Sequence, residues 1–293
     1  MPTVWAGDGR HFAQLLCILS LACGLVGVAP PPEACDTSGM AAPATVLITG
    51  AAQRIGRILA LRFAADGWRV GVHCRSSKQE AQQLAAQIAG HGGTAAVLEA
   101  DLADAAQVAT LIPACTAALG APTLLVNNAS TFVYDTVASL DPKVWDAQMA
   151  VNVKAPVFLS RAFAAALPAG ESGNIVNIVD QRVWKPTPNF FSYAASKMAL
   201  WSVTRTLAQA LAPRIRVNAI GPGPVLKSAH QTDEEFRRQC EATILGRGTT
   251  PDEIAQAIQF ILSAPAMTGQ MVALDGGQHL AWDTPDVRRA PRG

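Results

Sequence analysis

Short apolar runs alternate along the chain with longer stretches in which apolar residues recur every three to four positions. The short runs are typical of buried strands, and the longer stretches are typical of helices that pack on them. We expect strands at 44–49, 68–74, 94–100, 122–127, 174–179, 216–221 and 271–277. We expect helices at 54–66, 78–89, 103–119 and 251–263, two more between 142 and 167, and one from near Tyr193 to about Ala212.

This order of elements predicts the fold class. Alternating strand and helix units form parallel sheets, because each helix carries the chain back across one face of the sheet by a right-handed crossover. The sequence therefore predicts an α/β fold at residues 44–282, a doubly wound (Rossmann) parallel sheet of about seven strands with helices on both faces. Such sheets bind ligands at the carboxyl ends of their strands.

The first 43 residues do not continue the pattern. Phe12 to Ala29 is almost wholly apolar and resembles the apolar region of a signal peptide or a short anchor. The run is at the lower limit of a membrane span and contains two glycines, so we expect no stable membrane association. We favour a misassigned start, with translation beginning at Met40. Residues 1–43 are then an extension outside the fold, and 283–293 are a mobile C-terminal tail.

Composition narrows the partners of the chain. Its 293 residues carry a formal net charge of +1, with acids and bases intermixed. This balance provides no basic stripe for nucleic acid, so the expected partner is a small molecule. The six cysteines include no CxxC pair and the five histidines form no ligand cluster, so we expect no metal.

Tyr193 and Lys197 are the first candidates for chemistry. Their spacing of four residues places them on one face of a helix, with the ammonium near the phenol. A nearby positive charge stabilises the phenolate and lowers the pKa of the tyrosine, which makes it a usable general acid. The spacing alone favours an amphipathic helix with tyrosine in the core and lysine in solvent. The other motifs decide between these readings.

The turn after the first expected strand contains Gly50 and Gly56. Gly50 permits a tight turn, Gly56 allows the helix to pack closely on the sheet, and the helix N-terminus offers free N–H groups to a phosphate. The turn is a candidate dinucleotide-binding loop. Two glycines after a strand also occur in ordinary turns, so this motif gains its weight from the strand and helix series that follows it.

Four motifs in order resemble the short-chain dehydrogenase/reductase superfamily, over residues 44–282. They are the Gly50 loop, Asn127-Asn128-Ala129-Ser130, Tyr193-x-x-x-Lys197 and Gly221-Pro222-Gly223. By this resemblance Tyr193 donates a proton, and Lys197 lowers its pKa and holds the nicotinamide ribose. Asn152 matches the position that holds a water relay to the lysine, and Asn127 lines the cofactor site by steadying the central strands.

Two positions depart from the usual superfamily pattern. Arg54 stands where the phosphate loop usually has a glycine, and Asp180 stands where the catalytic serine is usual. An aspartate is a poor neighbour for the oxyanion that develops from a carbonyl, whereas it suits a nitrogen heterocycle with amino and ring N–H donors. An arginine on the loop can meet a cofactor phosphate and also a pterin carbonyl.

This pairing resembles the pteridine reductases and the related bacterial dihydromonapterin and dihydrofolate reductases. Phe132 lies where that group stacks the pterin against the nicotinamide, although an ordinary loop hydrophobe is an equal alternative from the residue alone. Ser130 agrees with the same group, and Trp184 is a weaker pocket candidate. The resemblance gives a substrate-binding set of Arg54, Ser130, Phe132, Asp180, Phe190 and Tyr193.

The residues after the second expected strand indicate the cofactor. An NAD-preferring site has an acid there, whereas this chain has Arg75 and Ser76, which can bind a 2′-phosphate. We therefore expect NADPH, although an exposed arginine at a strand end is also common. The expected cofactor-binding set is Gly50, Arg54, Ile55, Gly56, Arg75, Ser76, Asp101, Leu102, Asn128, Ala129, Ser130, Tyr193, Lys197, Pro222 and Gly223.

The function that these expectations favour is an NADPH-dependent reductase that transfers hydride to a C=N bond of a pterin or dihydropterin. The catalytic residues expected are Tyr193, Lys197, Asp180 and Asn152. One alternative is a carbonyl reductase of the same superfamily acting on a ketone or quinone, and another is an NADPH-binding regulator without turnover. The resemblance also implies a homotetramer, which the alanine-rich helices at 153–167 and 191–211 fit, and a cytoplasmic location.

Overall fold

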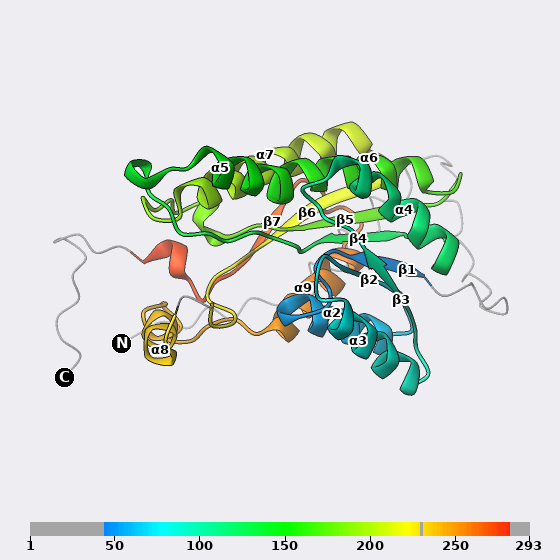
Figure 1. Cartoon of the computed structure of the whole chain (residues 1–293), viewed down its shortest axis with the longest axis horizontal. Coiled ribbons are helices and arrows are strands. Elements are labelled where there is room, and N and C mark those ends of the chain that lie inside the picture. The colour runs from blue at the N-terminus through cyan, green and yellow to red at the C-terminus, as the bar shows by residue number, and fades with distance from the viewer. Residues whose placement is uncertain (1–43, 229–230, 282–293) are drawn as a thin grey trace, which may run out of the picture. The chain divides into compact units, whose positions relative to one another are not determined.

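Seven parallel strands form one sheet at the centre of the computed structural model, which describes residues 44–228 and 231–281 (Figure 1). The strand order is β3-β2-β1-β4-β5-β6-β7. The strands are β1 (Thr45–Ile48), β2 (Arg69–Cys74), β3 (Thr94–Glu99), β4 (Leu124–Asn127), β5 (Gly173–Ile178), β6 (Ile215–Pro222) and β7 (Met271–Leu274). The expected doubly wound parallel sheet is confirmed.

Helices cover both faces of the sheet (Figure 1). On one face lie α4 (Ala105–Leu119), α5 (Pro142–Met149), α6 (Ala155–Ala166) and α7 (Phe191–Leu211). On the other face lie α2 (Arg54–Ala65), α3 (Lys78–Gly90) and α9 (Pro251–Ser263). A π-helical turn, η2 (Ala150–Lys154), joins α5 directly to α6.

Alternate residues of the strands enter separate cores, which is why the strands read as unbroken apolar runs. In β1, Val46 and Ile48 pack with residues of α2 and α9, whereas Leu47 between them packs with residues of α4 and α6. All three side chains are fully buried. The central strands end at similar levels, since Ile48 is opposite Val126 and Asn127 is opposite Asn177. Their following loops therefore meet at one edge of the sheet.

The structure differs from expectation most after β6. A helix, α8 (Asp233–Glu241), lies in a stretch for which we expected none. It is mostly charged, with Phe236 and Cys240 as its apolar residues, and its start is fixed by a capping box between Thr232 and Glu235. The short turns are η1 (Val137–Ser139), η3 (Gln181–Val183) and η4 (Gln278–Leu280).

None of the helices within 44–228 and 231–281 combines the length and apolar character that a membrane span requires. The expectations for 1–43 and 283–293 lie outside the described residues.

Candidate active site

A cleft of about 1060 Å³ lies at the carboxyl ends of the strands. It brings together every residue of the expected cofactor-binding and substrate-binding sets, which come from loops and helices up to 173 positions apart. Asn152 and Asn127 are buried and lie outside the cleft lining, and Trp184 is also absent from it, packing instead on His279. The volume is at the upper end of the usual range for a site that holds a small organic ligand.

The first loop of the cleft has the geometry that a phosphate requires. Gly50 has a φ of 63°, which favours glycine, and a Cβ on Gly56 would lie 2.2 Å from the Gly50 carbonyl oxygen. The N-cap of α2, Gln53, makes no side-chain cap, and the first turn contains no acid. The N–H groups at the start of α2 are thus available to an anion.

Arg54 has a role in the structure that the sequence did not indicate. Its φ of 53° is the left-handed conformation, in which the glycine usual at this position is unstrained. Its guanidinium donates to the carbonyl oxygens of Lys227 (2.9 Å) and Leu226 (3.1 Å). Arg54 therefore ties the loop after β6 to the phosphate loop. Contact with a substrate stays a prediction.

His73 also shapes the phosphate loop and was missed from the sequence. Its Nδ1 accepts from the Gly50 N–H (2.9 Å), and its Nε2 lies 3.1 Å from the Ala100 carbonyl oxygen. Both bonds form only if the ring is neutral with its proton on Nε2. Burial lowers the pKa of His73, against the opposing effects of the Ala100 carbonyl and the Asp101 charge. No sequence motif marks this histidine.

The loop after β4 is locked to the phosphate loop by Asn128. Its side-chain amide donates to the carbonyl oxygens of Thr49 (2.9 Å) and Gly50 (3.2 Å). Asn127 instead donates to Asn177 Oδ1 (2.8 Å), linking β4 to β5. Asn127 steadies the central strands as expected, but the expectation that it lines the cofactor site is wrong, because its side chain points between the strands and is buried.

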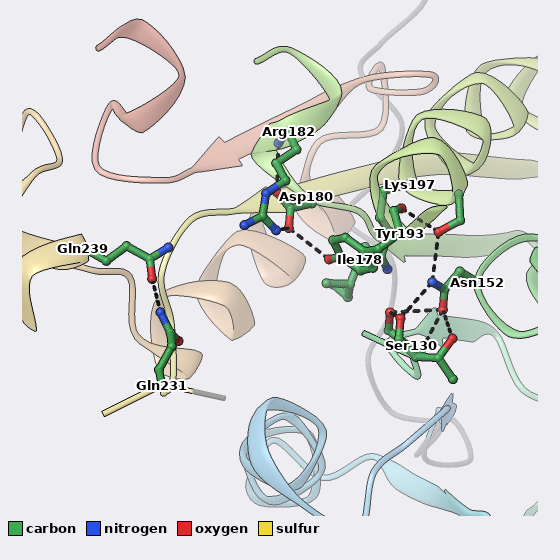
Figure 2. A network of polar contacts seen from close by, with 11 residues as sticks. Ser130, Asn152, Ile178, Asp180, Arg182, Tyr193, Lys197, Gln231 and Gln239 are labelled. Atoms are coloured by element: carbon green, nitrogen blue, oxygen red, sulfur yellow. Dashed lines mark hydrogen bonds and ion pairs between the residues drawn. The ribbon is translucent and has the colours of Figure 1, made fainter. Parts of the chain in front are cut away.

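Asn152 lies in the π-helical turn η2, a conformation that is frequent at functional sites. Its amide nitrogen donates to Ser196 Oγ (2.9 Å) and to the Thr131 carbonyl oxygen (3.0 Å), and its Oδ1 accepts from the Thr131 N–H (2.9 Å). Figure 2 shows Asn152 between Ser130 and the helix that carries Lys197. Asn152 therefore ties the loop of Ser130 and Thr131 to α7.

Tyr193, Asp180 and Lys197 lie together in the lining of the cleft (Figure 2). The Tyr193 hydroxyl donates to Asp180 Oδ2 over 2.9 Å. The Lys197 ammonium donates to the Ile178 carbonyl oxygen over 2.7 Å, and its nitrogen is 5.7 Å from the centroid of the Tyr193 ring. Tyr193 and Lys197 are both buried, which excludes the reading of a lysine in solvent.

The pKa of Tyr193 is not lowered, contrary to expectation. Burial, with the negative charge of Asp180, raises the pKa of the phenol well above its usual value, and Arg182 only partly opposes this. Burial also lowers the pKa of Lys197 to about 8, with Asp180 opposing. The sequence showed the lysine spacing but not the burial, which disfavours the charged form of both groups. Tyr193 therefore holds its proton at neutral pH, as a proton donor must.

A buried acid positions the start of α7 and was also missed. Asp135 Oδ1 accepts from the backbone N–H of Ser192 (3.1 Å), and an acid at a helix N-terminus is favourable. Phe190, just before α7, has a φ of 56°, and this left-handed residue turns the chain into the helix. Asp135 is a lone acid in a loop, without any spacing that marks it.

An aromatic cluster lies beside Tyr193. The rings of Phe132 and Phe190 are stacked with centroids 4.3 Å apart, and the Phe132 ring meets the Tyr193 ring edge to face at 4.6 Å. Phe132 thus contacts Tyr193, the expected proton donor, and Phe190 packs on the Phe132 ring. The cluster offers a flat apolar surface within reach of a hydroxyl donor and a carboxylate.

Comparison with known proteins agrees with this arrangement. The profile of the short chain dehydrogenase family matches residues 44–238. A short-chain type dehydrogenase/reductase of Picea abies is 34% identical over 251 residues, covering 79% of this chain and 91% of that protein. A 3-oxoacyl-(acyl-carrier-protein) reductase of Synechocystis sp. is 30% identical over 239 residues, covering 79% and 95%. The crystal structure of FolM alternative dihydrofolate reductase 1 from Brucella suis, in complex with NADP, superimposes with a TM-score of 0.82 at 48% identity, covering 85% of this chain and 100% of that chain.

Proposed function

The chain belongs to the short-chain dehydrogenase family, and from this premise we propose that it is an NADPH-dependent reductase of a C=N bond in a pterin or dihydropterin. One observation carries the proposal, the hydrogen bond of 2.9 Å from the Tyr193 hydroxyl to the Asp180 carboxylate, beside the Phe132 ring. The 48% identity to a protein described as an alternative dihydrofolate reductase supports the same substrate class.

The carboxylate distinguishes a pterin from a carbonyl substrate. A carbonyl gains negative charge on oxygen as it is reduced, and the Asp180 charge beside Tyr193 would oppose that charge. A pterin ring presents N–H donors, for which a carboxylate is the matched acceptor. The ring of Phe132 suits a flat heterocycle, because two flat aromatic ring systems stack favourably on each other.

The residues of the cleft fit a dinucleotide cofactor for two reasons. Gly56 has no Cβ to collide with the Gly50 carbonyl oxygen, and the N-terminus of α2 has no side-chain cap, so its N–H groups can bind a phosphate. NADPH, when bound, supplies the hydride for the reduction. Gly50, Arg54 and the loop with Asn128 would hold its phosphates, and Arg75 with Ser76 would select its 2′-phosphate.

The chain's own groups supply the proton. Tyr193 holds it on the phenol oxygen, at the position where Asp180 keeps the hydroxyl oriented. Lys197 is charged below its pKa of about 8 and stabilises the phenolate that remains when the proton leaves. Asn152 keeps Ser196 and the Thr131 loop in place around them.

The experiment that tests the proposal compares substrate classes. NADPH oxidation is followed with dihydrobiopterin, dihydromonapterin and dihydrofolate, and with a panel of ketones and quinones, at equal protein concentration. We expect kcat/KM to be highest for a dihydropterin. Turnover of ketones or quinones alone would overturn the pterin assignment and leave the family and the role of Tyr193 intact.

A carbonyl reductase is the second candidate, favoured by the 3-oxoacyl reductase relative at 30% identity. The third, a regulator without turnover, is disfavoured because a binding protein needs only the cofactor loops, whereas Asn152, Tyr193 and Lys197 are all in place and hydrogen-bonded. NADPH that is not oxidised with any member of either substrate panel would favour the regulator.

NADPH affinity is expected to fall in acid because of His73. Its lowered pKa keeps the ring neutral at pH 7, and a proton gained at lower pH removes the acceptor for the Gly50 N–H. We therefore expect the dissociation constant of NADPH to rise as the pH is lowered below the ordinary histidine value of about 6.5, because the pKa of His73 lies below that value. Titration calorimetry at each pH measures this.

The matched variant for this prediction is His73→Asn, whose side chain does not titrate. The 2′-phosphate of NADPH also gains a proton in this range, but it does so with both proteins. The dissociation constant of NADPH should therefore change less with pH in the variant than in the wild type, and the difference is the contribution of the His73 ring. Equal slopes in the two proteins would show that His73 does not control the loop.

Arg75→Ala is expected to weaken NADPH binding about tenfold to a hundredfold, the loss of one charge-assisted bond to phosphate, and to leave NADH binding unchanged. Arg75 is exposed and lines the cleft after β2. Fluorescence titration with both nucleotides measures the change. Arg57→Ala is the control, since Arg57 is a nearby cation that bonds Gln87 outside the cleft. An equal loss for NADH would contradict the assignment.

The assembly state and the cytoplasmic location stay predictions. Phe158 on α6 and Phe260 on α9 are about half exposed, at 43% and 54%, on opposite faces of the sheet. Apolar side chains on two faces suit a homotetramer built from two kinds of contact. Light scattering coupled to size-exclusion chromatography would measure the mass, and a monomer would refute the tetramer.

A further inference from the structure

Arg182 lies beside the candidate proton donor, and no sequence motif pointed to it. It belongs to η3, directly after β5. Its guanidinium donates to Asp180 Oδ2 (3.3 Å), the oxygen that also accepts from the Tyr193 hydroxyl (2.9 Å), as Figure 2 shows. Its backbone N–H donates to Asp180 Oδ1 (2.8 Å). Arg182 therefore holds both oxygens of the carboxylate that orients the phenol.

The guanidinium of Arg182 also lies against the ring of Tyr193. Its central carbon is 5.8 Å from the ring centroid, and the nitrogen of Lys197 is 5.7 Å from the same point. Both distances are within the range of cation–π attraction. The guanidinium lies at similar distances from the rings of Phe132 (5.7 Å) and Phe190 (5.3 Å), and the Arg182 side chain is only 19% exposed. Two cations from different elements thus lie almost equally far from the phenol ring.

The two cations differ in the pH range over which they are charged. Burial lowers the pKa of Lys197 to about 8, and its ammonium bonds the Ile178 carbonyl oxygen. A guanidinium in a protein keeps its charge at every pH at which the fold is studied. Lys197 therefore loses its charge as the pH rises through about 8, whereas Arg182 remains a cation.

Within the described residues, the other charged groups that bond at Tyr193 or at the start of its helix are acids. Asp180 contacts the hydroxyl itself, and Asp135 contacts the backbone N–H of Ser192. A negative charge at either place disfavours a phenolate, as burial does. Arg182 acts in the opposite direction, since its charge lowers the pKa of Tyr193 against burial and the charge of Asp180.

Resting on the proposed function, we propose that Arg182 is a positioning residue for proton transfer, which holds Asp180 against Tyr193 and stabilises the phenolate with a fixed positive charge. In the reduction the hydride joins the carbon of the C=N bond, the π electrons move to the nitrogen, and the nitrogen takes the proton of Tyr193. The O–H bond of the phenol breaks, and its electron pair stays on the phenol oxygen. A cation beside the ring makes the loss of the proton less unfavourable.

The ionisation of Tyr193 can be measured without a substrate, because the chain contains only two tyrosines. In a Tyr134→Phe background, 3,5-difluorotyrosine is incorporated at position 193 alone, and fluorine NMR follows its titration. The fluorines make the phenol more acidic, which offsets the raised pKa of Tyr193. We expect Arg182→Gln to titrate at a higher pH than its parent, because a charge that favours the phenolate is lost. Equal midpoints would overturn the role of Arg182.

The pH profile of the reaction provides a second test. We expect Arg182→Gln to lower kcat for a dihydropterin about tenfold near neutral pH, the effect of one nearby charge on an ionisation. The alkaline limb of kcat should move to higher pH, because removal of a cation raises the pKa of neighbouring groups. A lower kcat with an unmoved limb would reduce Arg182 to a structural residue, against the proposal. If no dihydropterin is reduced, the proposed function fails, while the NMR titration of Tyr193 still tests Arg182.

Two further variants separate charge from packing. Arg182→Lys keeps the charge and loses the planar fork, so its NMR midpoint should lie closer to that of the parent than the midpoint of Arg182→Gln does. A midpoint as high as in Arg182→Gln would contradict a role of the charge. Lys185→Gln removes a cation of the same loop, whose ammonium bonds the Gln278 carbonyl oxygen (3.4 Å), and it should leave the midpoint unchanged. An equal displacement in Lys185→Gln would show that net charge alone sets the ionisation of Tyr193, against the proposal.

Discussion

Tyr193→Phe is expected to lower kcat with a dihydropterin by about 10³-fold, within the usual range for the loss of a general acid. The variant keeps the ring that packs on Phe132 and removes the hydroxyl that bonds Asp180. The phosphate contacts that we assign lie elsewhere and the Tyr193 ring is retained, so the dissociation constant of NADPH should change little. Stopped-flow oxidation and fluorescence titration measure the two quantities.

Tyr134→Phe is the control, since the chain contains only two tyrosines. Tyr134 is 56% exposed, and its hydroxyl makes a long bond of 3.4 Å to Asn189. We expect wild-type kcat for this variant. Retention of turnover in Tyr193→Phe would refute Tyr193 as the donor, and equal losses in both variants would show that the effect is not specific to the buried phenol.

Asp180→Ser is expected to lower kcat/KM for dihydropterins by about a hundredfold, near the upper range for a hydrogen bond to a charged group. The substitution restores the residue usual in the superfamily and removes the acceptor shared by Tyr193 and Arg182. Turnover of ketones should not fall, because the charge that opposes a developing oxyanion is gone. Parallel assays of both substrate classes measure the change.

Asp146→Ser provides the control for charge, since Asp146 is an exposed acid on α5. It should leave both substrate classes unaffected. A pterin rate that is the same in Asp180→Ser and the wild type would leave the family assignment standing. It would reduce Asp180 to a residue that only holds Tyr193 and the η3 turn.

The elements that the sequence predicted well are those whose apolar pattern is dictated by burial. β1 and α9 were predicted to within a residue at most of their observed limits, because each is packed in the sheet cores. The charged helix α8 was missed, since its start depends on the capping box at Thr232 and not on apolar spacing. Local polar signals of this kind are weaker than periodicity.

Site residues that belong to a sequence motif were predicted, whereas roles that depend on contacts between distant parts of the chain were missed. Tyr193 and Lys197 come from a spacing within one helix turn, but the pKa of Tyr193 depends on burial and on Asp180, thirteen positions away. The bonds of Arg54 reach carbonyls more than 170 residues later. His73, on β2, accepts from the N–H of Gly50, in the turn that follows the neighbouring strand β1. Such partners are brought together only when the sheet folds, so no local sequence pattern predicts them.

Transfer of deuterium tests the central claim most directly. NADPH deuterated at C4 of the nicotinamide is mixed with the wild-type chain and a dihydropterin, and the product is examined by mass spectrometry and NMR. We expect one deuterium on a ring carbon of the former C=N bond, and about 10³-fold slower formation of this product with Tyr193→Phe. A pterin recovered without deuterium, while ketones in the same assay become labelled, would contradict the account and identify a carbonyl reductase.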